Sequence, residues 1–139
     1  MLTPCKITDY ISKFKPEWIC TMPDGCPPDD VLVAEAHPFF RLAQQADTFS
    51  VDDFKSYTEV NPQRQWGPML PLAVGLSLIE GEAKARRCLK LPMFRRFQGI
   101  VALTLQPPDG VVKQTGANRS HYTWWRTKKF QMSNLYMLK

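Results

Sequence analysis

The sequence lacks several features that would place a protein in a known functional class. No stretch of about 18 consecutive apolar residues occurs, so we expect no transmembrane helix and no membrane partner. The first residues lack the charged head and apolar segment of a secretory signal, so we expect an intracellular, cytoplasmic protein. The phosphate loop, the GxGxxG fingerprint, the GxSxG elbow and the HExxH zinc motif are all absent. These absences exclude an assignment of activity from a short signature.

Cysteine is scarce, and the four cysteines are scattered along the chain. Cys20 and Cys26 are separated by five residues, which is wider than the usual spacing of a zinc knuckle. A metal site completed by Cys5 and His37 is one interpretation, and reduced, partly buried thiols are the other. We favour thiols and expect no metal, because only the spacing speaks for a metal site.

Histidine is scarcer still, so any histidine-based acid–base chemistry must use His37 or His121. His37 precedes Pro38 at the start of an expected strand, and we interpret it as a surface or capping residue. His121 is the better functional candidate because it lies among hydroxyl and aromatic residues. Its alternative role is that of a structural histidine whose two nitrogens hold a turn together.

The composition favours one ordinary domain. At 44% apolar and 12% aromatic residues, the chain can bury a core of its own. We predict a single compact α+β domain over residues 1–139, with a mixed or mostly antiparallel sheet and two to three helices. The N-terminal helix is predicted over about residues 4–15, because Thr3-Pro4 resembles a helix start and apolar residues follow at helical spacing.

Further elements follow from local patterns. Residues 80–89 are predicted to be helical, with favourable i,i+4 pairs Glu80–Lys84 and Glu82–Arg86. Ser50 to Asp53 resembles a capping box, and Gly75 marks a close approach or bend. Residues 61–72 are predicted to form a loop. Strands are predicted over residues 31–34, 39–43, 99–105 (as a central strand), 111–115 and 121–127, with an edge strand within 130–138.

Charge is divided unevenly along the chain. The acidic half, residues 1–82, has six Lys/Arg against twelve Asp/Glu, a net charge of −6. The basic half, residues 83–139, has twelve Lys/Arg and only Asp109, a net charge of +11. Either the halves attract one another, or the basic half faces an anionic partner. Six cations within residues 84–96 favour the partner.

The segment Ser120-His121-Tyr122-Thr123-Trp124-Trp125, followed by Arg126, is the densest group of candidate functional residues. Successive side chains of a strand point to opposite faces, so Trp124 and Trp125 cannot share one core. One indole must cover a second apolar layer or lie where a ligand docks. An imidazole, hydroxyls and indoles together favour a small-ligand or nucleotide pocket.

A wider pattern joins this segment to two earlier positions. Arg41 lies on an early expected strand, and Ser77 lies on a strand that leads into a helix. The order resembles that of ADP-ribosyltransferase-type folds, over about residues 38–125. The resemblance implies that Arg41 contacts the phosphates and nicotinamide ribose of NAD, and that Ser77 supports the nicotinamide. His121 or Thr123 would then direct the chemistry. The late-strand glutamate of that family is missing, which leaves NAD cleavage, RNA-end chemistry or a non-catalytic binder as alternatives.

The candidate site therefore takes a planar anionic ligand, with NAD as the cofactor to test. Arg41 would clamp a phosphate, and Trp124 or Trp125 would stack on a planar ring. A snorkelling arginine, core tryptophans and a helix-capping Ser77 are the structural alternatives. The candidate catalytic residues are His121, Thr123 and Ser77. The candidate ligand-binding residues are Arg41, Ser120, Tyr122, Trp124, Trp125 and Arg126.

Two other classes of function are open. A non-catalytic nucleic-acid-binding module would use the cations and interleaved aromatics of the basic half. The residues of that face are Lys84, Arg86, Arg87, Arg95, Arg96, Lys128 and Lys129. An interaction protein, such as an inhibitor, antitoxin or immunity partner, would fill a partner's groove with its aromatic residues.

Overall fold

A single curled antiparallel sheet forms most of the molecule. The computed structural model describes residues 1–139. The strand order is β1-β2-β6-β7-β4-β3-β5-β8, and every neighbouring pair is antiparallel. The strands are β1 (Leu2–Lys6), β2 (Asp30–Ala34), β3 (His37–Ala43), β4 (Leu76–Ile79), β5 (Gly99–Leu105), β6 (Gly110–Gln114), β7 (His121–Arg126) and β8 (Tyr136–Met137). The predicted α+β class is confirmed, with more sheet than we expected.

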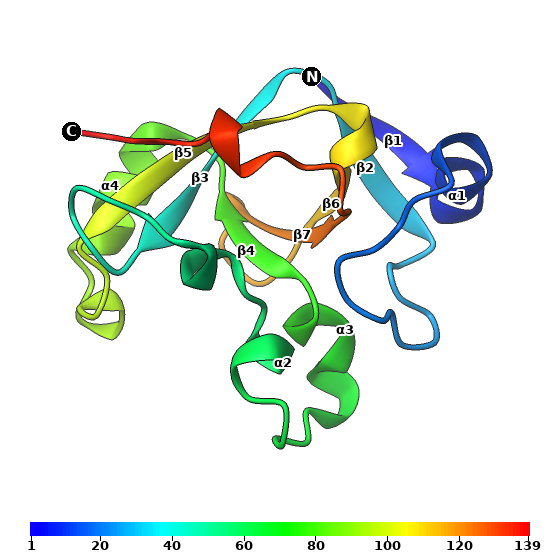
Figure 1. Ribbon diagram of the computed structural model, residues 1–139, viewed down its shortest axis with the longest axis horizontal. Coiled ribbons are helices and arrows are strands. Elements are labelled where there is room, and N and C mark those ends of the chain that lie inside the picture. Colours follow the sequence, from blue (N-terminus) through cyan, green and yellow to red (C-terminus); the bar gives the residue numbers. More distant parts are fainter.

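The helices are short and lie around the sheet (Figure 1). They are α1 (Ile7–Phe14), α2 (Tyr57–Val60), α3 (Leu70–Ala73) and α4 (Glu82–Leu89). The chain also forms short 3₁₀ helices, which are η1 (Val51–Phe54), η2 (Gly67–Met69), η3 (Pro92–Phe94), η4 (Pro107–Asp109) and η5 (Met132–Asn134). The helices α1 and α4 lie at opposite ends of the molecule. No helix has the length and apolar character that a membrane crossing requires.

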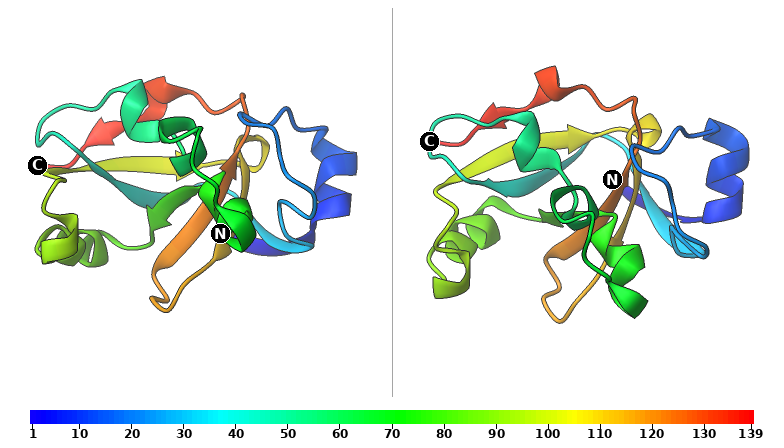
Figure 2. Two further views of the ribbon diagram at one scale, coloured as in Figure 1. Left: turned by 90° about the horizontal axis from the view of Figure 1, so that it is seen from below. Right: turned by 60° about the horizontal axis from the view of Figure 1, so that its bottom comes forward.

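The sheet is strongly curled (Figure 2). Its buried apolar side chains form three clusters. Trp124 packs in the largest cluster beside Phe39 and Phe130, whereas Trp125 packs in a second cluster beside Tyr10. Both indoles are fully buried, and they lie on opposite faces of β7. The adjacent tryptophans thus serve two apolar layers, which was one of the two predicted outcomes. The third cluster lies beneath α4, around Leu42.

The predicted N-terminal helix over residues 4–15 is wrong at its start. Residues Leu2–Lys6 form the edge strand β1, paired with β2 from Leu2↔Ala34 to Lys6↔Asp30, and the helix begins only at Ile7. Proline at position 4 is compatible with this strand because an edge strand can leave one backbone position without a ladder donor. Tertiary pairing with β2 therefore overrides the local helix-start pattern.

The remaining predicted elements are close to the observed ones. The strand β5 has its predicted bounds, but it lies second from the sheet edge instead of at the centre. The predicted loop over 61–72 contains η2 and the start of α3. The predicted Glu80–Lys84 pair is wrong, because Glu80 precedes α4, whose N-cap is Gly81. Glu80 pairs with His37 instead, at 2.7 Å. The Glu82–Arg86 pair is confirmed at 2.9 Å.

The strands β3 and β4 separate almost at once. Their register contains the single pair Phe40↔Ile79, whereas β4 pairs with β7 over its whole length. Gly75, which precedes β4, is packed so closely that an added Cβ would collide with the Thr123 side chain, as the predicted close approach implies. The segment between β3 and β4 lies beside the resulting opening, and it carries η1, α2, η2 and α3.

Candidate functional site

A cavity of about 950 Å³ lies where β3, β4 and β7 meet the α2 and η3 segments. Three of the predicted catalytic and ligand-binding residues line it, namely Arg41 from β3, Ser77 from β4 and His121 from β7. These three strands are neighbours in the sheet, with β4 in the middle. The cavity is also lined by Asp52, Asp53, Lys55, Tyr57, Val60, Arg64, Trp66, Ile79, Leu91, Met93, Phe94, Arg96, Phe97, Thr115 and Asn118.

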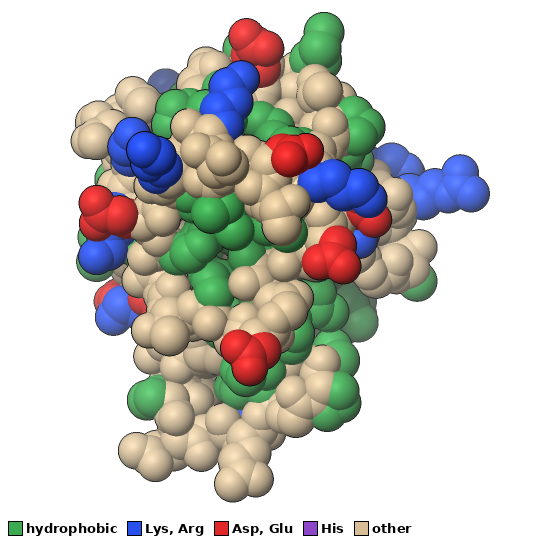
Figure 3. All heavy atoms as spheres, turned by 90° about the vertical axis from the view of Figure 1, so that its right-hand side faces the viewer, with side chains coloured by type: hydrophobic (Ala, Val, Ile, Leu, Met, Phe, Trp, Pro, Cys, Tyr) green, Lys and Arg blue, Asp and Glu red, His purple; other side chains and the backbone are tan.

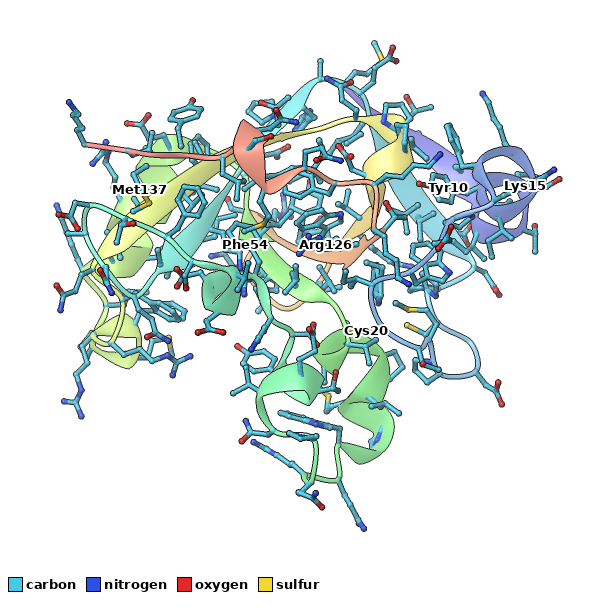
Figure 4. The ribbon with its side chains drawn as sticks, in the orientation of Figure 1. Tyr10, Lys15, Cys20, Phe54, Arg126 and Met137 are labelled. Carbon is cyan, nitrogen blue, oxygen red and sulfur yellow. The ribbon has the colours of Figure 1, made fainter.

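The guanidinium of Arg41 is held by backbone carbonyls. Its Nε donates to Asp53 O and its Nη1 to Ser77 O, each at 2.7 Å, and the group lies 5.6 Å from the centre of the Phe54 ring, labelled in Figure 4. No carboxylate lies within ion-pair distance of it. Burial lowers the pKa of Arg41 to about 10, with Tyr57 and Asp53 opposing that shift. An arginine of this kind remains charged at neutral pH and attracts an anion.

Arg41 and His121 reach this region from different faces of the sheet. Along β3, Arg41 alternates with Phe40 and Leu42 and so shares the face of Phe39 and Ala43. Ser77 lies opposite Thr123 in the β4–β7 register, and Ile79 lies opposite His121, which puts these four side chains on one face. The Arg41 guanidinium meets the Ser77 backbone where β3 and β4 have separated. Arg41, Ser77 and His121 therefore line one cavity, although Arg41 and His121 are not hydrogen-bonded to each other.

His121 is fixed by Thr115 at the start of β7. Its Nδ1 lies 3.1 Å from both Thr115 O and Thr115 Oγ1, and Thr115 Oγ1 lies 2.7 Å from Thr123 Oγ1. A carbonyl can only accept, so Nδ1 carries the proton in this hydrogen bond. The neutral ring then has a free acceptor at Nε2, which makes no hydrogen bond within the protein. Thr123 is buried and orients this chain of hydrogen bonds from beneath.

The other predicted ligand-binding residues do not line the cavity. Ser120 lies in the turn before β7, where its carbonyl accepts from the Glu80 amide at 2.8 Å. Tyr122 packs edge-on against Phe39, and burial raises its pKa, with Glu80 adding to that shift. The Trp124 and Trp125 indoles donate to Asp109 O and Pro71 O inside the core. Neither indole therefore has a face open to a ligand.

The predicted nucleic-acid face is divided by the structure. Lys84, Arg86, Arg87, Arg95 and Arg96 are exposed on α4 and on the segment around η3. Lys128 and Lys129 are also exposed, but they follow the other end of β7, where Lys128 N donates to Glu17 O. In Figure 1 this orange-red segment lies well away from α4.

Tyr57 and Trp66, an aromatic group that the sequence analysis missed, line the cavity. The Arg64 guanidinium lies 4.1 Å from the centre of the Trp66 ring, and the Tyr57 ring centre lies 5.8 Å from that of Trp66. The Nε1 of Trp66 is buried and has no hydrogen-bond partner. An unpaired buried donor is costly, so a ligand acceptor would be well placed there. The alternation of Arg64 and Trp66 within a proline-rich loop was the only signal in the sequence.

The α2 segment is anchored by a second cluster, of which only Ser56 lines the cavity. Ser56 and Glu59 form a capping box, and the Cys20 thiol donates to Glu59 Oε1 at 3.3 Å. Burial raises the pKa of Cys20 to about 11, and the Glu59 carboxylate adds to that shift. Arg126, labelled with Cys20 in Figure 4, has a buried Nε without a partner, and burial lowers its pKa. The Cys20 thiol is therefore protonated at neutral pH. No group of three or more His, Cys, Asp or Glu side chains is arranged to hold a metal ion.

Comparisons with family models, with curated proteins and with solved structures found no match to this chain.

Proposed function

We propose that the cavity binds a nucleotide of the NAD type, in an α+β domain that resembles ADP-ribosyltransferase-type folds. One observation carries the proposal. The three positions that this resemblance singled out, Arg41, Ser77 and His121, lie on adjacent strands and line a single cavity. The helix α4 begins three residues after β4 ends, so the strand with Ser77 leads directly into a helix.

The charge and hydrogen-bonding state of these residues suits such a ligand. A guanidinium has five N–H donors, and Arg41 uses two of them on backbone carbonyls, which leaves donors for a phosphate or a ribose hydroxyl. The Ser77 hydroxyl makes no hydrogen bond within the protein, and its strand is only half-buried at this point. The free Nε2 of His121 can accept from a ribose hydroxyl.

The α2–η2 segment supplies apolar and aromatic surface for a base. Tyr57 and Trp66 line the cavity from that segment, and the unpaired Trp66 Nε1 can donate to a ring nitrogen or a carbonyl of the ligand. A few convergent polar groups within a largely apolar lining are typical of small-molecule sites. The cavity residues include no glutamate, so binding is the function that we propose, and turnover is a separate measurement.

Isothermal titration calorimetry with NAD and ADP-ribose tests the proposal. We expect both ligands to bind the wild-type chain, and His121→Ala or Ser77→Ala to weaken binding about fivefold to tenfold through the loss of one hydrogen bond. His37→Ala is the matched control, because His37 is the other histidine and does not line the cavity. Release of nicotinamide, followed by chromatography, reports any cleavage of NAD.

The proposal fails if neither ligand binds at millimolar concentration, or if His37→Ala weakens binding as much as His121→Ala. Co-purification of a protein partner, together with that failure, would favour the interaction-protein alternative. Exposed apolar side chains at the cavity mouth, such as Val60, Leu91 and Met93, would then be the first contacts to test.

A further inference from the structure

A ridge of cations borders one side of the cavity. We define the basic ridge as the exposed residues Lys84, Arg86, Arg87, Lys90, Arg95 and Arg96, which belong to α4 and to the segment around η3. The buried side of α4 consists of Ala85 and Cys88, which pack in the cluster around Leu42. The apolar side of α4 is therefore used by the core, and the cations point outward.

The charges of the basic ridge are not neutralised within the protein. Arg86 pairs with Glu82 at 2.9 Å, whereas the other five cations have no carboxylate within 4.0 Å. Glu82 is the one carboxylate of the acidic half that pairs with a cation of the ridge, and the other ion-paired carboxylates of that half bind Lys6, His37 and Lys55 of the same half. Attraction between the two halves of the chain therefore does not account for this cluster.

The face at the other end of the molecule does not repeat this pattern. The face around α1, at the other end of the molecule, has Lys/Arg and Asp/Glu side chains interspersed (Figure 3). A solvated surface of mixed sign needs no partner, but several unpaired cations of one sign favour a polyanion.

The ridge is continuous with the cavity. Arg96 belongs to both, and its guanidinium lies 4.6 Å from the centre of the Phe97 ring, which also lines the cavity. Phe94 lies 6.3 Å from Phe97, centre to centre, and both rings are half-buried. Met93, between the ridge cations and the cavity, has 72% of its surface exposed. Cations beside partly exposed aromatic and thioether groups are the combination that unpaired bases use for stacking.

We propose that the basic ridge binds single-stranded nucleic acid, with its phosphates on the ridge and a base near Phe97 at the cavity mouth. That this nucleic acid is a second substrate or ligand of the cavity rests on the proposed function. Its binding to the basic ridge does not depend on the proposed function. A lipid surface is the less favoured occupant, because a membrane-binding helix needs an unburied apolar face and α4 has none.

Fluorescence anisotropy with labelled 12-nucleotide RNA and DNA tests this proposal. We expect Arg87→Glu/Arg95→Glu to weaken binding at least tenfold. The slope of the logarithm of the binding constant against the logarithm of the salt concentration should become shallower by about 1.4, which corresponds to two lost phosphate contacts on a single strand. The matched control is Lys128→Glu/Lys129→Glu, which makes the same charge change at exposed positions away from the ridge. We expect the control to retain wild-type affinity within about twofold.

Three results would overturn the proposal. The control variant could lose as much affinity as the ridge variant, a duplex of the same length could bind as tightly as the single strand, or phosphatidylserine vesicles could bind when the oligonucleotides do not. Calorimetry with NAD on the ridge variant separates this proposal from the proposed function. Arg87 and Arg95 do not line the cavity, so we expect NAD affinity to be unchanged in that variant. Ridge-dependent oligonucleotide binding without any NAD binding would leave the ridge proposal standing and remove the nucleotide site.

Discussion

At the scale of single residues, the side chains with the strongest sequence signals have different fates. Trp124 and Trp125 are core residues, whereas His121 from the same segment lines a cavity. Arg41 is the most informative residue, because a largely buried guanidinium without a carboxylate partner is unfavourable unless it has other partners. Its partners are two backbone carbonyls that no strand pairing satisfies.

Replacing Arg41 tests both of its roles. Arg41→Met would leave Asp53 O and Ser77 O without these donors, and we expect the free energy of unfolding to fall by about 2 kcal/mol, the net of lost hydrogen bonds and a removed buried charge. Urea denaturation measures this change. Sulfate should raise the melting temperature of the wild-type chain more than that of the variant, because binding to the folded state adds to the general stabilisation by this salt. Equal sulfate effects on both chains would show that Arg41 is not an anion site.

At the scale of elements, short motifs predict where a turn begins better than they predict which element follows. The box at Ser50 is present, but its helix ends at Phe54 and a second capping box starts α2 at Ser56. The pattern at Thr3-Pro4 resembles a helix start yet lies in β1, because pairing with β2 satisfies that backbone. The α2 segment depends on its box, since it has one helical turn and no buried residue of its own.

Loss of the second box should therefore affect the cavity as well as stability. We expect Ser56→Ala to lower the free energy of unfolding by about 1 kcal/mol and to weaken NAD binding, because Tyr57 and Trp66 lose their anchor. Gln106→Ala removes a side-chain hydrogen bond, the one that Gln106 Oε1 accepts from Ala36 N at 3.0 Å, away from the cavity lining, and is the control. It should lower stability without changing NAD affinity. If both variants bind NAD alike, α2 does not shape the site.

At the scale of the whole molecule, the sheet brings together residues that are far apart in the sequence. Arg41 and His121 meet one cavity because β4 pairs with β7 and only briefly with β3. The fold also splits the cations of the basic half between the basic ridge, on α4 and around η3, and the Lys128–Lys129 region after β7. The same packing buries the thiols of Cys20 and Cys26, and this burial makes the stability of the fold depend on pH.

Stability should fall in mildly alkaline solution. Burial raises the pKa of both Cys20 and Cys26 to about 11, whereas a thiol in the unfolded chain titrates near about 8.5. A raised pKa in the folded state means that this stability is complete below about pH 8.5 and is lost as the pH rises toward 11. Urea denaturation at pH 7.5 to 9.5 under reducing conditions should show the decline.

The double variant Cys20→Ala/Cys26→Ala should have a flatter pH profile over the same range, whatever its stability at pH 7. Cys5→Ala, at the half-buried edge of the sheet, controls for the loss of a thiol as such. An unchanged slope in the double variant would assign the decline to other groups, such as Tyr10, whose pKa is also raised by burial.

The sequence by itself determined the α+β class, most strand positions, the capping box at Ser50, the placement of Trp124 and Trp125 on opposite faces of a strand and the concentration of cations in residues 84–96. These properties depend on local spacing and composition, which act within a few residues. Tertiary structure alone decided that residues 2–6 form a strand, that Trp66 lines the same cavity as Arg41, that the Trp124 and Trp125 indoles both lie in the core, and that Lys128 lies away from the ridge. Strand pairing between distant segments decides such features, because the partner that satisfies a backbone group or covers a side chain is not encoded beside it.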